Sequence, residues 1–148
     1  MCKKNPTTVL VVEDDPFILC LIEESLSANE YQTILASSGE EALEIASKQT
    51  SIDLLLTDID MPGINGIVLA KQFCNLYPQI KVLFMSGCMV PSTLFRIFGK
   101  KVAFLEKPIR VNMLVEMITG KKHSSAKFDG LSFLGFTVAL PIMVLTTC

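Results

Sequence analysis

The chain has 148 residues, half of them apolar, and it carries 13 basic and 15 acidic side chains. This length suits one domain that buries a hydrophobic core without a metal or a disulfide to hold it together. A net charge of -2 and a pI near 5.4 lack the basic excess with which proteins bind phosphate backbones, so we expect no nucleic-acid partner. The five cysteines are odd in number and form no C-x-x-C pair, so neither a disulfide framework nor a zinc site is predicted. Because the start of the chain also lacks a secretory signal, we expect a reducing cytoplasm as the compartment.

The first 120 residues alternate short β-rich runs with longer stretches of helical period. The uncharged run Thr8–Val12 is typical of a strand that is buried on both faces. A helix is predicted to follow over residues 16–28, with Pro16 in its first turn and Asp15 as a plausible cap. Five apolar side chains are expected to share one face of this helix: Phe17, Ile18, Leu21, Ile22 and Leu26.

The same alternation continues through four more units. The predicted elements are a strand over 31–36, a helix over 39–48, a strand over 53–57, a helix over 67–76, a strand over 80–85, a short helix over 91–98, a strand over 102–105 and a helix over 110–119. Five strands that each precede a helix are too few for a closed eight-stranded barrel, so an open, doubly wound α/β sheet is favoured. In such sheets the ligand lies beyond the carboxyl ends of the strands, which is where candidate site residues are sought.

Polar side chains with a capacity for chemistry follow four of the five predicted strands. They are Glu13, Asp14 and Asp15 after the first strand, Asp58 after the third, Ser86 after the fourth and Lys107 after the fifth. Crowded carboxylates repel one another unless a cation neutralises them, and an all-oxygen cluster suits Mg²⁺. A lysine and a hydroxyl beside the carboxylates add the positive charge and donors that phosphoryl transfer requires. Asp58, on a central strand, is then the natural nucleophile.

Four segments of the sequence together resemble the receiver domain of response regulators in two-component signalling. They are residues 11–16 (VVEDDP), 54–63 (LLLTDIDMPG) with Gly66, 84–87 (FMSG) and 104–108 (FLEKP). The resemblance covers about residues 7–119, and the order and spacing of the segments make it specific. It implies a (βα)5 flavodoxin-like fold with one parallel sheet in the strand order 2-1-3-4-5.

The resemblance also implies a role for each site residue. Asp58 matches the phosphoacceptor, which would take a phosphoryl group from a phosphohistidine on a sensor histidine kinase or a histidine phosphotransfer protein. Asp14 matches a direct Mg²⁺ ligand and Glu13 a ligand through water, while Asp58 and the backbone carbonyl of Asp60 would complete the metal site. The domain is then expected to be a phosphoacceptor in signalling and not an enzyme with a separate substrate.

Three further positions match the parts of the family that respond to phosphorylation. Lys107 corresponds to the lysine that pairs with phosphoryl oxygens, and its bond to Pro108 is expected to be cis. Ser86 corresponds to the hydroxyl that closes on the phosphoryl group, and Phe104 to the switch aromatic that turns inward. Each also has a plainer interpretation: Lys107 as a solvated surface lysine, Ser86 as a turn hydroxyl and Phe104 as core. Asp15 has one too, as a helix cap and not a ligand.

Two alternative functions stay open from the sequence. One is a degenerate receiver that acts only as a protein-binding module, although every position needed for the chemistry holds a competent residue. The other is a phosphatase like the haloacid dehalogenases, because Asp58 and Asp60 form a D-x-D pair. That fit is partial, since Pro62 stands where that family has Thr or Val and no acidic cluster follows Lys107.

The composition changes after residue 120, so we expect a receiver domain over 1–120, a polar linker over 121–130 and an apolar tail over 131–148. The tail has no charged residue, and as a helix its 18 residues would span about 27 Å, just short of a bilayer core of about 30 Å. Pro141 in the middle of the run weighs against a membrane anchor. The alternatives are a segment that packs on the receiver or a partner, or an appendage without function. The stretch is too short for an effector domain, so a single-domain receiver is expected.

Overall fold

A computed structural model describes residues 7–49, 51–88, 93–99 and 102–120 of the chain. Five strands alternate with five helices within these ranges: β1 (Thr8–Val12), α1 (Pro16–Ser27), β2 (Gln32–Ala36), α2 (Gly39–Lys48), β3 (Leu54–Asp58), α3 (Gly66–Leu76), β4 (Lys81–Ser86), α4 (Thr93–Phe98), β5 (Val102–Glu106) and α5 (Val111–Thr119). The strands form one sheet in the order β2-β1-β3-β4-β5, and every neighbouring pair is parallel. The predicted α/β fold and its strand order are confirmed.

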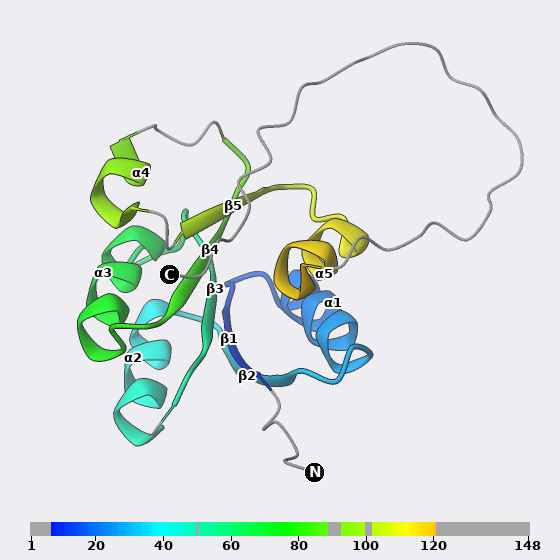
Figure 1. The fold of residues 1–148 in the computed structure, drawn as a ribbon, viewed down its shortest axis with the longest axis horizontal. Coiled ribbons are helices and arrows are strands. Elements are labelled where there is room, and N and C mark those ends of the chain that lie inside the picture. Colours follow the sequence, from blue (N-terminus) through cyan, green and yellow to red (C-terminus); the bar gives the residue numbers. More distant parts are fainter. Residues whose placement is uncertain (1–6, 50, 89–92, 100–101, 121–148) are drawn as a thin grey trace, which may run out of the picture.

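The sheet lies between two layers of helices. Helices α1 and α5 cover one face, and α2, α3 and α4 cover the other (Figure 1). Successive side chains of β1 alternate between the two cores: Val9 and Val11 pack on the α1 side, and Leu10 and Val12 on the α2 side. All four are fully buried, which explains why the sequence shows a continuous apolar run here and not an alternating one.

The helices that follow the first three strands begin at the carboxyl edge of the sheet with capped N-termini. The Asp15 carboxylate accepts the backbone N–H of Phe17 at 2.8 Å and that of Ile18 at 3.4 Å. Ser38 caps α2 and Asn65 caps α3 in the same way. These bonds satisfy N–H groups that a helix start otherwise leaves without partners, so they fix where each helix begins. Asp15 therefore acts as the predicted cap.

Several element boundaries differ from the predicted ones by a residue or two. Strands β3, β4 and β5 each extend one residue further, so that Asp58 and Ser86 are the last residues of their strands and not the first beyond them. The predicted start of the short fourth helix at residue 91, the linker 121–130 and the tail 131–148 lie outside the described residues. Within the described part of the chain, no helix is long and apolar enough to cross a membrane.

The shared apolar face predicted for α1 is wrong in part. Ile22 and Leu26 are fully buried, but Phe17 is 84% exposed and Leu21 is 42% exposed. Successive side chains of a helix point in directions about 100° apart around its axis. Because Ile18, Ile22 and Leu26 form the row that faces the sheet, Phe17 and Leu21 point toward water. Cys20, on the same helix, is exposed as well.

Candidate functional site

Three of the predicted residues meet at the carboxyl edge of the sheet. Asp58 ends β3, Glu13 follows β1 directly, and Lys107 follows β5 directly. The Lys107 Nζ atom lies 2.7 Å from Asp58 Oδ2 and 3.1 Å from Glu13 Oε1, and it donates a hydrogen bond to each. The lysine therefore reaches across the end of β4 to bridge two carboxylates that neighbouring strands bring together.

Both carboxylates are taken out of water. Glu13 is 1% exposed and Asp58 5% exposed, whereas the Lys107 side chain keeps 19% of its surface. Burial raises the pKa of the Glu13 carboxyl above its usual value, and the hydrogen bond and charge of Lys107 offset this only in part. Burial also acts to lower the pKa of Lys107, but the hydrogen bonds and charges of Asp58 and Glu13 outweigh it, so that pKa is raised. The lysine is therefore held in its charged form.

Asp14 adds a third carboxylate. Oxygen atoms of Glu13, Asp14 and Asp58, which we call the acidic cluster, all lie within 4.8 Å of one another. One ammonium faces three carboxylates here, so the site keeps an excess of negative charge when all are ionised. The buried Glu13 Oε2 atom lies 2.9 Å from Lys107 Nζ but accepts no hydrogen bond from the described residues. Hard oxygen donors with unused capacity and surplus negative charge fit Mg²⁺.

The two other acidic residues near the site take different positions. The Asp15 carboxylate points to the start of α1 as its cap. Asp60 is exposed and its carboxylate is outside the acidic cluster, but its backbone N–H donates to Asp58 Oδ1 at 3.2 Å. The two oxygens of the Asp58 carboxylate are thus held separately, one by a backbone amide and the other by Lys107.

The loop after β3 is fixed by two contacts, of which the sequence signalled only one position. A Cβ atom on Gly66 would collide with the backbone carbonyl oxygen of Asp58, so α3 begins in direct contact with the end of β3. Glu40, at the start of α2, accepts the backbone N–H of Ile64 at 3.1 Å. Gly66 belongs to the motif that the sequence showed, but the Glu40 contact joins positions 24 residues apart and has no local signature.

Ser86 lies near this group but its hydroxyl has other partners. The hydroxyl accepts the N–H of Cys88 at 3.1 Å and donates to the carbonyl of the same residue at 3.0 Å, while the Ser86 carbonyl accepts the N–H of Lys107 at 2.8 Å. Ser86 thus connects the ends of β4 and β5 through its backbone. Its side chain closes a turn, as the plainer interpretation of the sequence expected.

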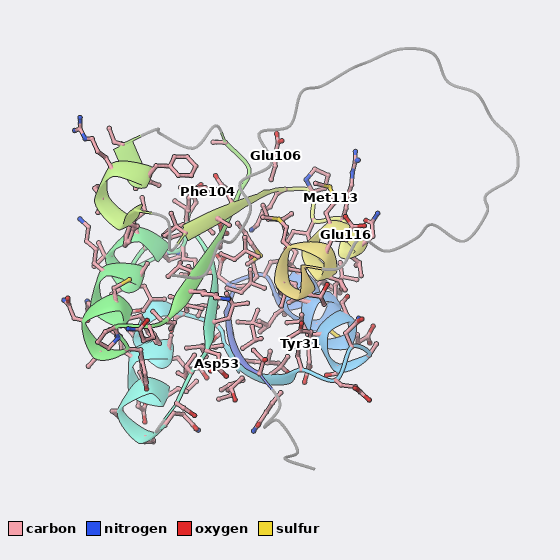
Figure 2. The ribbon with its side chains drawn as sticks, viewed as in Figure 1. Tyr31, Asp53, Phe104, Glu106, Met113 and Glu116 are labelled. Atoms are coloured by element: carbon pink, nitrogen blue, oxygen red, sulfur yellow. The ribbon has the colours of Figure 1, made fainter. Side chains whose placement is uncertain are left out.

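Phe104 packs among aromatic rings on the α4 side of the sheet, whereas Met113 lies on α5 on the opposite side (Figure 2). The Phe104 ring stacks on that of Phe84 with 5.3 Å between centroids. The ring of Phe95 meets the Phe104 ring edge-on, with 4.8 Å between centroids. Phe95 belongs to α4 and is 37% exposed. A movement of the Phe104 ring would therefore change the packing of Phe95 at the surface of α4.

The peptide bond between Lys107 and Pro108 is cis, as expected.

The phosphatase alternative finds no support at the site, because the carboxylates beside Asp58 come from the loop after β1, ahead of the nucleophile in the chain.

A model of the response regulator receiver domain matches residues 9–119. The chain is 34% identical over 131 residues to the two-component response regulator-like protein PRR37 of Oryza sativa subsp. indica, a match that covers 84% of this chain and 18% of that protein. It is 26% identical over 123 residues to the transcriptional regulatory protein GlrR of Escherichia coli, covering 82% of this chain and 28% of that protein. The chain thus spans less than a third of these relatives.

Solved structures give the same result over the whole length of isolated domains. The receiver domain of the hybrid histidine kinase CckA superposes with a TM-score of 0.66 and 34% identity, covering 76% of this chain and 96% of that one. The response regulator TrrA of Thermotoga maritima, solved in complex with Mg²⁺ and BeF, superposes with a TM-score of 0.64 and 27% identity, covering 77% of this chain and 97% of that one.

Proposed function

Because this chain belongs to the family of response regulator receiver domains, we propose that Asp58 accepts a phosphoryl group from a phosphohistidine of a partner protein. The observation that carries the proposal is the contact of 2.7 Å between Lys107 Nζ and Asp58 Oδ2 within the acidic cluster. It supports a carboxylate that is oriented and faced by a positive charge. The donor would be a sensor histidine kinase or a histidine phosphotransfer protein in the cytoplasm.

The chemistry asks little of the protein beyond position and charge. An oxygen of the Asp58 carboxylate attacks phosphorus and forms the new P–O bond, while the P–N bond breaks and its electron pair passes to the imidazole nitrogen. Lys107 and the backbone N–H of Asp60 hold the carboxylate before the attack. The Lys107 ammonium is then close enough to the new phosphoryl oxygens to share their charge.

Glu13, Asp14 and Asp58 would hold Mg²⁺, together with the backbone carbonyl of Asp60. When bound, the ion would neutralise charge on the transferred group and on the acidic cluster. The protein side of this arrangement is the burial of Glu13, whose Oε2 atom lacks a hydrogen bond from the described residues.

The response to phosphorylation would begin at Ser86. Its hydroxyl has one proton, so it can donate to a phosphoryl oxygen on Asp58 only by giving up the bond that it donates to the Cys88 carbonyl. Phe104 would then change its packing against Phe84 and Phe95, which carries the change to α4. A downstream protein partner would read the altered surface.

The test is the intact mass of the protein after incubation with acetyl phosphate and Mg²⁺. We expect one phosphoryl group on the wild type, none on Asp58→Asn, and none when a chelator removes the metal. Asp53→Asn is the matched control, because Asp53 directly precedes the same strand at its opposite end and is exposed. Folded wild-type protein that takes up no phosphoryl group would contradict the proposal and favour a receiver that signals by binding alone.

A further inference from the structure

A recess lies at the amino-terminal edge of the sheet, opposite to Asp58. Its volume is about 520 Å³, and Tyr31 and Asp53, labelled in Figure 2, stand on its wall. Apolar side chains from the sheet, the end of α3 and the last turn of α5 form most of its surface, including Leu54, Leu76, Leu83, Ala103, Met117 and Ile118. We call this recess the amino-edge cleft.

The cleft opens where α5 ends. This helix has only nine residues and stops at Gly120, which takes a left-handed conformation with φ 68° and donates its N–H to the Glu116 carbonyl at 2.9 Å. Met117 and Ile118 in its last turn are half-buried and line the cleft. Leu76, on the same wall, is 58% exposed. A concentration of exposed apolar surface often marks an interaction site in soluble proteins.

Two polar groups of the cleft wall are already used within the fold. The Asp53 carboxylate accepts the backbone N–H of Thr8 at 2.8 Å. The Tyr77 hydroxyl lies 2.9 Å from the Ala46 carbonyl and 3.1 Å from the Gln49 carbonyl, and it can donate its one proton to either of them. With these groups satisfied, recognition in the cleft rests on apolar contact, and an uncharged apolar segment is the occupant that suits it.

We propose that apolar side chains from residues 131–148 of the same chain dock in the amino-edge cleft. Eighteen residues without a charge, twelve of them apolar, follow α5 after a charged stretch of ten residues, 121–130. A flexible chain of that length spans roughly 17 Å, and it starts at the helix end that lines the cleft. Binding within one chain would therefore take place at an effective concentration on the order of millimolar.

The sequence of the segment favours the cleft over a bilayer. Pro141 removes a backbone donor and interrupts a helix, and a helix is what a membrane requires. An extended segment in a protein cleft tolerates a proline without that loss. Residues 121–130 carry four charges, on Lys121, Lys122, Lys127 and Asp129. Charged side chains are rarely buried, so this stretch would serve as the connection and not as the occupant.

The test compares amide NMR spectra of the full chain with those of two double variants. Leu140→Asp with Val144→Asp places two charges in the apolar segment, and Ser124→Asp with Ser125→Asp places the same two charges in the tether. We expect the amide signals of Ala103, Met117 and Ile118 to move in the first variant only. Signals at Asp58 and Gly66 should stay in place in both, which reports that the domain is folded.

A change in the cleft wall supplies the reciprocal test. Met117→Glu should release the segment, so that the signals of residues 131–148 shift to the positions they take in the first double variant. Val68→Glu, on the exposed surface of α3, is the matched control and should leave them unchanged. Cleft signals that are the same in the wild type and in both double variants would overturn the proposal. So would shifts that grow with protein concentration, which indicate a second copy, or capture of the wild type by phosphatidylglycerol vesicles with the cleft signals unaffected.

Discussion

The Lys107 ammonium lies 2.7 Å from Asp58 Oδ2, although 49 positions separate the two residues in the chain. The parallel register brings them together, because β3 pairs with β4 and β4 with β5, so that all three strands end at one edge. The same ammonium also contacts Glu13 from the loop after β1. One side chain thus balances carboxylates from two strands, and the stability of the domain and its proposed chemistry depend on the same contact.

Lys107→Met should destabilise the metal-free domain, because it leaves Glu13 and Asp58 buried beside each other without a cation. We expect a loss of about 2 kcal/mol in the free energy of unfolding, below the 3–5 kcal/mol of a fully buried pair since the lysine is partly exposed. Mg²⁺ should restore more stability to this variant than to the wild type. Urea unfolding with and without the ion measures both effects.

Lys48→Met is the control for that experiment. Lys48 pairs with Glu44 at 2.7 Å, but both side chains are about two-thirds exposed on α2. The pair should therefore contribute no more than about 0.5 kcal/mol, independent of Mg²⁺. Equal losses in the two variants would contradict the assigned burial of the site.

Gly66→Ala should lower the free energy of unfolding strongly, although it adds only one methyl group. The added methyl group would meet the carbonyl of Asp58, which is backbone and cannot rotate away. We expect a loss of about 3 kcal/mol by urea unfolding, together with slower phosphorylation of Asp58. Gly87→Ala has open space around the new Cβ and should cost less than about 1 kcal/mol. A Gly66 variant as stable as the Gly87 variant would show that α3 does not press on β3.

The sequence was most informative where chemistry and strand ends coincide. Residues 13, 14, 58 and 107 could be assigned to one edge because parallel strands end together, and a run such as Thr8–Val12 has few other interpretations. Exposure on α1 was harder, since the apolar Phe17 and Leu21 are adjacent in helical projection to a truly buried row. The hydrogen bonds of Ser86 with Cys88 could not be predicted. A serine hydroxyl can bond to several nearby backbone groups, and which one it bonds to depends on small differences in the local backbone geometry.

Ser86→Ala should separate phosphoryl acceptance from the response to it. The variant loses the bonds of the hydroxyl to Cys88, which should lower the free energy of unfolding by about 1 kcal/mol. Acetyl phosphate should still modify Asp58, but the ring signals of Phe95 and Phe104 should no longer shift when it does. Ser86→Thr keeps the hydroxyl and should keep the shift. Ring signals that respond equally in the alanine and threonine variants would remove Ser86 from the switch.

Glu41 provides a pH-dependent contribution to stability that lies away from the acidic cluster. Its carboxylate accepts the N–H and the hydroxyl of Ser37, both at 2.7 Å, and these bonds hold the pKa of Glu41 below its usual value. The folded form therefore binds the proton less readily than the unfolded chain, so the contribution is present above the unfolded pKa and is lost as pH falls through the folded one. Because Glu41 is exposed, we expect this contribution to be only about 0.5 kcal/mol at neutral pH.

Glu41→Gln should be less stable than the wild type by that amount at pH 7. Urea unfolding at decreasing pH should show the free energies of unfolding of the two proteins converging below the usual glutamate pKa of 4.5. A difference that stays constant down to acid conditions would mean that the bond to Ser37 does not depend on the charge.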